Sequence, residues 1–139
     1  MSGERVNIIK DRACAFLDLA KELVDRRLDI SSFSVHQACQ LRVKASLLRF
    51  TGEIPRLHSI RELLGILAKK LEDLGFKEDA MKIMNFVRRR RGALIDIEAA
   101  YTESRYGMGA IARSVIEEIL RTAEELFKLL DEVEEHVLG

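Results

Sequence analysis

The sequence predicts an all-α protein, an antiparallel up-and-down bundle of about five helices. Apolar residues recur at spacings of three and four along most of the chain, which is the period of a helix with one buried face. No stretch alternates apolar and polar residues with the period of two that is typical of strands, and the only proline among the 139 residues is Pro55. The length and the 47% content of hydrophobic residues predict that residues 1–139 fold as a single helical domain.

The first two helices are expected at residues 4–27 and 33–50. The inner stripe of the second helix contains several small side chains, so a neighbouring helix can approach it closely. Ser31 or Ser32 can cap its N-terminus, because a serine oxygen accepts a hydrogen bond from the free N–H groups of the first turn. Gly52 suits a left-handed cap at its C-terminus.

Three further helices follow. Ser59 and Glu62 have the capping-box spacing, so we expect a third helix that begins at Ser59 and ends at Gly75. A fourth helix is expected at residues 77–104 and a fifth at residues 108–137. The short links between the helices favour antiparallel neighbours. The expected inner residues of the fourth helix are Ala80, Ile83, Met84, Val87, Leu94, Ile97 and Tyr101.

The charge balance and the cysteines limit the possible partners and the cellular location of the protein. Basic and acidic residues number 23 each, so the formal net charge is zero and gives no support to general DNA binding. No apolar run approaches the roughly 18 residues that span a bilayer, and the N-terminus lacks the layout of a signal peptide. Cys14 and Cys39 have no CxxC spacing and are expected to be reduced, half-buried thiols. We therefore expect a soluble cytoplasmic protein without membrane contact.

Metal and phosphate-loop chemistry have little support. The histidines His36, His58 and His136 are scattered, and none has the spacing of a zinc or di-iron motif. The glycines form no phosphate-binding loop, and Gly107 and Gly109 indicate a turn more readily than an anion site. We expect neither a metal nor a cofactor.

An arginine block, Arg88 to Arg91, allows two interpretations. Successive helical residues rotate by about 100°, so the four side chains cannot all point away from the core. Extending the stripe from Val87 to Leu94 places Arg90 or Arg91 on or near the inner face. A buried guanidinium needs an anion. The site is then either an anion-binding cleft or, as we favour, an ion pair with Glu98 or with a glutamate of the last helix. The block could also contact another subunit.

Two polar groups are candidates for ligand contact. Gln37, Gln40 and Lys44 share one face of the second helix, next to His36, although such a face is often only solvated. The end of the fourth helix carries Tyr101, Arg105 and Tyr106. Tyrosines beside an arginine can stack on a base and hold a phosphate, but they more often pack at a helix end.

The order of these features resembles the HEPN family. Residues 33–45 resemble its second-helix signature, which reads roughly Gln-Gln-Ala-Ala-Glu-Lys-Ala-Leu-Lys-Ala. Residues 55–64 resemble its Pro-x-x-His-x-Leu-x-x-Leu segment, and residues 101–106 resemble its Tyr-x-x-Ser/Ala-Arg-Tyr block. The acidic last helix also fits. The chain departs from the signature at Gln40 and Leu41, where the family has glutamate and lysine, so the charge pattern of this face is altered.

The resemblance implies a helical bundle that is often dimeric, binds nucleotides and accompanies a small nucleotidyltransferase. Some branches of the family are ribonucleases, usually toxins, which use an arginine followed after roughly four to six residues by a histidine. No histidine of this chain has an arginine at that spacing upstream, so the resemblance implies a non-catalytic binding module. The implied nucleotide-binding residues are Gln37, Gln40, Lys44, His58, Tyr101, Arg105 and Tyr106.

Two alternatives stay open at this stage. One is a metal-independent ribonuclease in which His58 is the acid or base and Arg105 stabilises the phosphate. The other is a purely structural adaptor that pairs with itself or with a nucleotidyltransferase. We expect a homodimer in either case, with the small-residue face of residues 33–50 or the arginine block, Arg90 and Arg91 in particular, as contact surfaces.

Overall fold

The computed structural model describes the backbone of residues 2–106 and 111–139, and the side chains of residues 3–102 and 111–139. These residues contain helices and no strand, which confirms the all-α prediction. Six helices are present where about five were expected. Their bounds are α1 Ser2–Leu23, α2 Leu28–Thr51, α3 Ile60–Asp73, α4 Lys77–Arg89, α5 Arg91–Tyr106 and α6 Arg113–Leu138. The expected start of the last helix at residue 108 and the Gly107–Gly109 turn lie outside the described residues.

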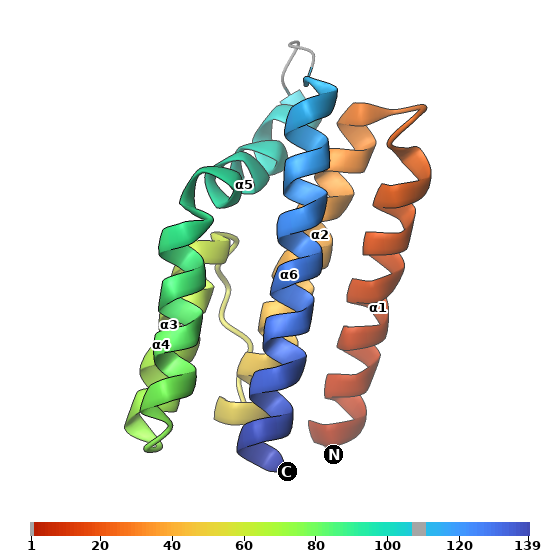
Figure 1. Cartoon of the computed structure of the whole chain (residues 1–139). Helices are drawn as coiled ribbons and strands as arrows, with labels where there is room; N and C mark the ends of the chain where they lie inside the picture. The colour runs from red at the N-terminus through yellow and green to blue at the C-terminus, as the bar shows by residue number, and fades with distance from the viewer. Residues whose placement is uncertain (1, 107–110) are drawn as a thin grey trace.

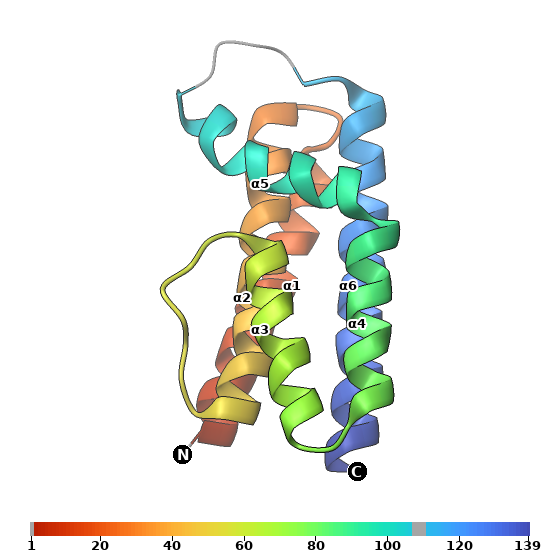
Figure 2. The same cartoon turned by 90° about the vertical axis from the view of Figure 1, so that its left-hand side faces the viewer.

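Three long helices, α1, α2 and α6, run side by side, and both termini lie at the same end of them (Figure 1). The shorter α3 and α4 form an antiparallel hairpin along one side of this group (Figure 2). Helix α5 turns away from the top of α4 and crosses the bundle toward α2 and α6. The core lies between α2, α6 and the hairpin. None of the helices in the described segments is long and apolar enough to cross a membrane.

The small side chains of α2 face the inside of the same chain. Ala38, Cys39 and Ala45 have no exposed surface, and α1 lies along α2 for most of its length. This close approach was expected from the small residues. The suggestion that a second subunit uses the same face was wrong, because α1 already covers it.

The N-terminus of α2 differs from the prediction. The helix begins at Leu28, so Ser31 and Ser32 lie inside it, and the capping residue is Arg27 without a side-chain hydrogen bond. Both serines are buried, and each donates its hydroxyl proton to a backbone carbonyl, Ser31 to Ala20 and Ser32 to Asp29. Their oxygens satisfy backbone groups from within the helix rather than at its end.

The other expected caps are confirmed. Gly52 ends α2 in a left-handed conformation with φ 79°, and Gly75 follows α3 with φ 93°. Ser59 caps α3, accepting a hydrogen bond of 3.2 Å from the backbone N–H of Glu62. The connection between these two helices, residues 52–59, runs back along α2 (Figure 2).

The helix expected at residues 77–104 is divided at Arg90, whose φ of −108° and ψ of 20° leave the helical region. The Arg90 guanidinium reaches across to α6. Gly92 lies just beyond the break, and because glycine has a low helix propensity, a change of direction here costs little free energy. The break shifts the buried face. Phe86 becomes fully buried, whereas Met84 and Val87, expected inside, are only partly buried.

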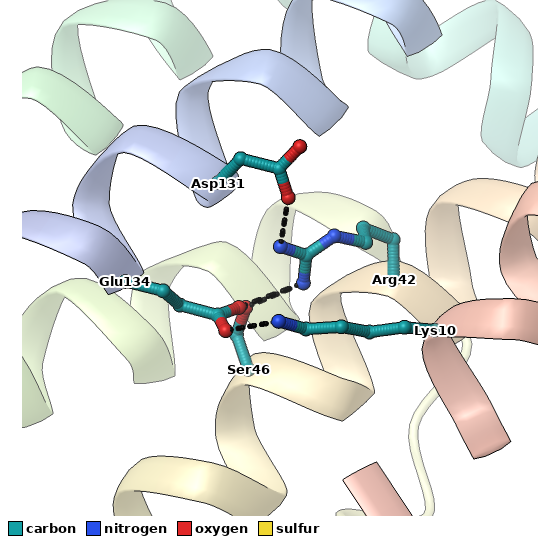
Figure 3. Close-up of polar contacts among 5 residues, drawn as sticks. All are labelled: Lys10, Arg42, Ser46, Asp131 and Glu134. Carbon is teal, nitrogen blue, oxygen red and sulfur yellow. Dashed lines mark hydrogen bonds and ion pairs between the residues drawn. The ribbon is translucent and has the colours of Figure 1, made fainter. Parts of the chain in front are cut away.

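A charged cluster is buried between α1, α2 and α6 (Figure 3). Arg42 is 1% exposed, and its guanidinium donates to Glu134 at 2.8 Å, to Asp131 at 2.8 Å and to Ser46 at 2.9 Å. Lys10 of α1 pairs with the other oxygen of Glu134. This cluster was not predicted from the sequence. The available signal was that Arg42 lies three residues after Cys39 and four before Ser46, on the small-residue stripe itself.

Opposing effects act on the Glu134 carboxyl group. Burial by itself raises its pKa. The charge of Arg42 and the hydrogen bonds from Lys10, Ser46 and Arg42 outweigh burial, so the pKa of Glu134 lies below its usual value. The carboxylate is therefore ionised at neutral pH, and the cluster joins three helices through charge-assisted hydrogen bonds.

Candidate functional site

Polar and aromatic side chains from three separate segments meet on one side of α2. Helix α2 contributes His36, Gln37, Gln40 and Lys44. The connection before α3 contributes His58, and α5 contributes Tyr101. We call these six residues the His–Tyr cluster. The spacing of the α2 residues places them along one side of the helix. The return of the 52–59 connection along α2 brings His58 level with Gln40 (Figure 2).

Hydrogen bonds fix the two imidazole rings. His36 Nε2 donates to the backbone carbonyl of His58 at 3.0 Å, and the Gln37 side-chain N–H donates to His36 Nδ1 at 3.2 Å. His58 Nδ1 donates to Gln40 Oε1 at 2.5 Å, and Lys44 Nζ donates to the same oxygen at 3.1 Å. Because carbonyl oxygens only accept, these partners assign the proton to Nε2 in His36 and to Nδ1 in His58. His58 Nε2 is then the acceptor atom of an exposed ring.

Tyr101 fixes the same histidines through ring contacts. Its ring stacks on His58 with centroids 5.0 Å apart and an angle of 15° between the planes. It also meets the His36 ring at 4.8 Å and 46°, and the Phe33 ring at 6.2 Å and 20°. Tyr101 is half-buried while His58 is exposed, so the stack ends at the surface with an aromatic ring of fixed orientation.

Burial favours the uncharged forms of two cluster residues, His36 and Lys44. His36 has no exposed surface, and burial lowers its pKa despite the hydrogen bond to the His58 carbonyl, so the ring is neutral at pH 7. Burial also lowers the pKa of Lys44, which is half-buried. Within the described part of the chain, Lys44 has no carboxylate partner. It is therefore a partly desolvated cation whose charge is not balanced by any carboxylate of the side chains that the structure describes.

Glu98, the carboxylate that influences the pKa of His36, is already bound. Glu98 of α5 accepts hydrogen bonds from the Arg61 backbone N–H at 3.1 Å and from its guanidinium at 2.9 and 3.0 Å. This pair also occupies the N-terminus of α3. Glu98 lies close enough to His36 to influence its pKa, but it does not pair with Lys44.

The structure brings five of the seven predicted nucleotide-binding residues together, and the side chains of the other two are not described. Gln37, Gln40, Lys44, His58 and Tyr101 come together in the His–Tyr cluster. The side chains of Arg105 and Tyr106 lie outside the described residues. No role was predicted for His36, although its buried ring links Gln37 to the His58 backbone. Its position within the motif segment of residues 33–45 was the available signal.

The arginine block lies apart from this cluster. Arg90 pairs with Glu118 at 2.7 Å and with Glu125 at 2.8 Å, both on α6, which matches the ion-pair interpretation of an inward arginine. Arg89 also pairs with Glu125, while Arg91 is exposed. The third histidine, His136, lies near the C-terminus and bonds to Asp79 at 2.7 Å.

The family model of the HEPN domain matches residues 6–133, which is nearly the whole sequence. The chain belongs to the HEPN family. This membership confirms the resemblance inferred from the sequence, and the matched residues include every member of the His–Tyr cluster. A search of curated protein sequences finds no match to this HEPN chain. Among the residues that the structure describes, no three His, Cys, Asp or Glu side chains are grouped to hold a metal ion. The His–Tyr cluster of this HEPN domain offers a ligand hydrogen-bonding groups, the Lys44 cation and the faces of its aromatic rings.

Proposed function

We propose that this HEPN domain is a non-catalytic nucleotide-binding module and that the His–Tyr cluster is its binding site. The observation that carries the proposal is Lys44, a half-buried ammonium group that pairs with no carboxylate among the described side chains, next to an exposed aromatic stack. A desolvated cation without a counterion favours an anionic ligand. A nucleotide offers such an anion together with a ring that can stack.

The proposed pose places each part of the ligand against a matching group. The phosphate meets Lys44, and the base stacks on the outer face of His58, whose plane Tyr101 holds. His58 Nε2 accepts a hydrogen bond from an exocyclic amine of the base. The side-chain carbonyl oxygen of Gln37 accepts a second hydrogen bond from the ligand. Because these rings are fixed before binding, little conformational entropy is lost when the base stacks.

We also propose the biological setting. The domain acts in the cytoplasm as a homodimer and as the partner of a small nucleotidyltransferase. Family membership supports this proposal, as do the two cysteines, which are free as in a reducing compartment. The arginine and histidine spacing of ribonuclease branches is absent from the sequence, which supports binding rather than RNA cleavage.

Isothermal titration calorimetry with AMP and ATP at low salt tests the binding site. The wild-type chain should bind, and Lys44→Ala should raise the Kd about tenfold, since a charge-assisted hydrogen bond contributes about 1.5 kcal/mol or more. His58→Ala should weaken binding at least about fivefold through the lost stacking. Lys82→Ala, which removes an exposed lysine of α4, is the matched control and should leave the Kd unchanged.

Two results would remove this site. One is the absence of binding heat at about 1 mM nucleotide, where even weak complexes form. The other is an equal Kd for the wild-type chain, Lys44→Ala and His58→Ala. Incubation of the same protein with RNA tests the ribonuclease alternative. RNA cleavage that is lost in His58→Ala would favour that alternative over the binding proposal.

A further inference from the structure

The surroundings of Lys44 favour its uncharged amine. The side chain is half-buried, and burial lowers its pKa, so a larger share of it is neutral than in an exposed lysine. Lys10, Lys21 and Lys69 each pair with a carboxylate, which holds the proton on the amine. Among the described side chains, no carboxylate does this for Lys44. Because only the neutral amine has a free electron pair, Lys44 is suited to act as a nucleophile.

The Lys44 amine is also held in a defined place. Its Nζ donates to Gln40 Oε1 at 3.1 Å, and the same oxygen accepts the proton of His58 Nδ1 at 2.5 Å. Two nitrogens that share one acceptor lie close together, so the amine stands beside the ring on which we propose that a base stacks. One N–H of Lys44 points at Gln40, and the electron pair of the neutral amine therefore points away from it.

The proposed nucleotide pose identifies an electrophile that would reach this amine. It places the phosphate of the ligand against Lys44 and the base on His58. An acyl-adenylate is the mixed anhydride of a carboxylic acid and AMP, so its carbonyl carbon is attached to a phosphate oxygen. When such a molecule takes the AMP pose, its carbonyl carbon lies beside Lys44 Nζ. Binding then converts a reaction between two free molecules into one within a complex, which raises its rate.

We infer that Lys44 accepts an acyl group from an acyl-adenylate bound at the His–Tyr cluster. The neutral amine attacks the carbonyl carbon, a C–N bond forms, and the bond between that carbon and the phosphate oxygen breaks. AMP leaves with the electron pair of the broken bond, and the nitrogen loses one proton to solvent water. The products are an amide at Lys44 and free AMP. This inference rests on the proposed nucleotide site and adds a modification that regulates it.

Acylation removes the charge on which the proposed site depends. The amide nitrogen is neutral, so the charge-assisted hydrogen bond to a phosphate is lost. The acylated chain should bind AMP about tenfold more weakly than the unmodified chain. Lys44→Gln carries a similar neutral amide and should bind AMP as weakly. Lys44→Arg keeps a positive charge without a nucleophilic amine, so it should bind AMP and resist acylation.

Acetyl-AMP is the probe that tests the transfer. The purified chain is incubated with it at about pH 8, where exposed lysines stay mostly protonated, and peptide mass spectrometry follows acetylation at each lysine. The matched control is Lys70 of α3, which is also half-buried and has no ion-pair partner among the described residues but lies outside the cluster. Lys44 should react at least about tenfold faster than Lys70. Excess AMP should slow Lys44 and leave Lys70 unchanged, and so should His58→Ala, which removes the stacking surface but keeps the amine.

Two results would overturn the inference. One is acetylation of Lys44 and Lys70 at equal rates. The other is a fast reaction of Lys44 that excess AMP does not slow, because the reactivity of the amine alone then explains it. Protection by AMP uses the wild-type chain, so this arm stands even if His58→Ala does not fold.

Calorimetry on the unmodified chain separates this inference from the proposed function. AMP binding without selective acetylation of Lys44 would contradict the inference and leave the proposed nucleotide site in place. A chain that binds no nucleotide would overturn both.

Discussion

The His58 ring lies nearly parallel to the Tyr101 ring, with centroids 5.0 Å apart, although the two residues come from a connecting segment and from a different helix. This contact joins α5 to the connection before α3, and through Gln40 it joins both to α2. Tyr101 thereby fixes the histidine that we propose as the stacking surface for a base. It is a positioning residue, since its own ring is half-buried behind His58.

Tyr101→Phe and Tyr101→Ala should therefore differ. The phenylalanine variant keeps the ring stack and should retain the nucleotide Kd within about twofold. The alanine variant removes the support of His58 and should weaken both folding, by about 2 kcal/mol or more, and nucleotide binding. Urea denaturation and calorimetry measure the two effects. Equal binding by both variants would show that the ring contact does not position His58.

Arg42 and Glu134 should stabilise the fold only when both are present, because removal of either one leaves the other without its buried partner. Glu134→Leu leaves the Arg42 guanidinium with only the exposed carboxylate of Asp131, so the free energy of unfolding should fall by about 3 kcal/mol. Arg42→Met should cost a similar amount, whereas Arg42→Met with Glu134→Leu should recover most of the loss. Denaturation of all four proteins gives the coupling energy. Additive losses in the double variant would contradict the structure in Figure 3.

His36 should make the fold sensitive to mild acid. Its pKa in the folded chain is lowered by burial, whereas the unfolded chain takes up the proton near pH 6.5. The unfolded state therefore binds more protons below that pH, and the stability due to neutral His36 is fully present above pH 6.5 and is lost as the pH falls. His36→Gln should have a flatter dependence between pH 7 and pH 5. Parallel slopes of unfolding free energy in the two proteins would contradict a buried neutral ring.

The two cysteines should react very differently. Cys39 is fully buried, and burial raises its pKa to about 12, so almost none of it is thiolate at pH 8. Cys14 is exposed, and although burial of its thiol raises the pKa, reagents can reach it. Ellman's reagent should therefore titrate one thiol in the native chain and two in guanidinium chloride. Rapid reaction of two thiols under native conditions would contradict the packing of α1 on α2.

Local signals were enough to predict most of the fold. Gly52, Ser59 and Gly75 act through their own backbone or the next turn, so their roles could be predicted from the sequence. The start of α2 and the break at Arg90 depend on contacts with α1 and α6, which a periodic pattern does not contain. The burial of Arg42 depends likewise on carboxylates about ninety residues away.

The candidate site was predictable only in part. Helical spacing placed Gln37, Gln40 and Lys44 together, but only the family resemblance linked them to His58 and Tyr101. The hydrogen-bonding partners of the rings, and the burial of His36 in particular, required the tertiary structure.

Chemical-shift mapping of the 15N-labelled chain during titration with AMP tests the central claim most directly, because it reports where a nucleotide binds. We predict the largest shifts at the side-chain amides of Gln37 and Gln40 and at the His58 ring nitrogens. The backbone amides of α3 and α4 should shift little. Shifts centred on another surface, or no shifts at millimolar AMP, would contradict it.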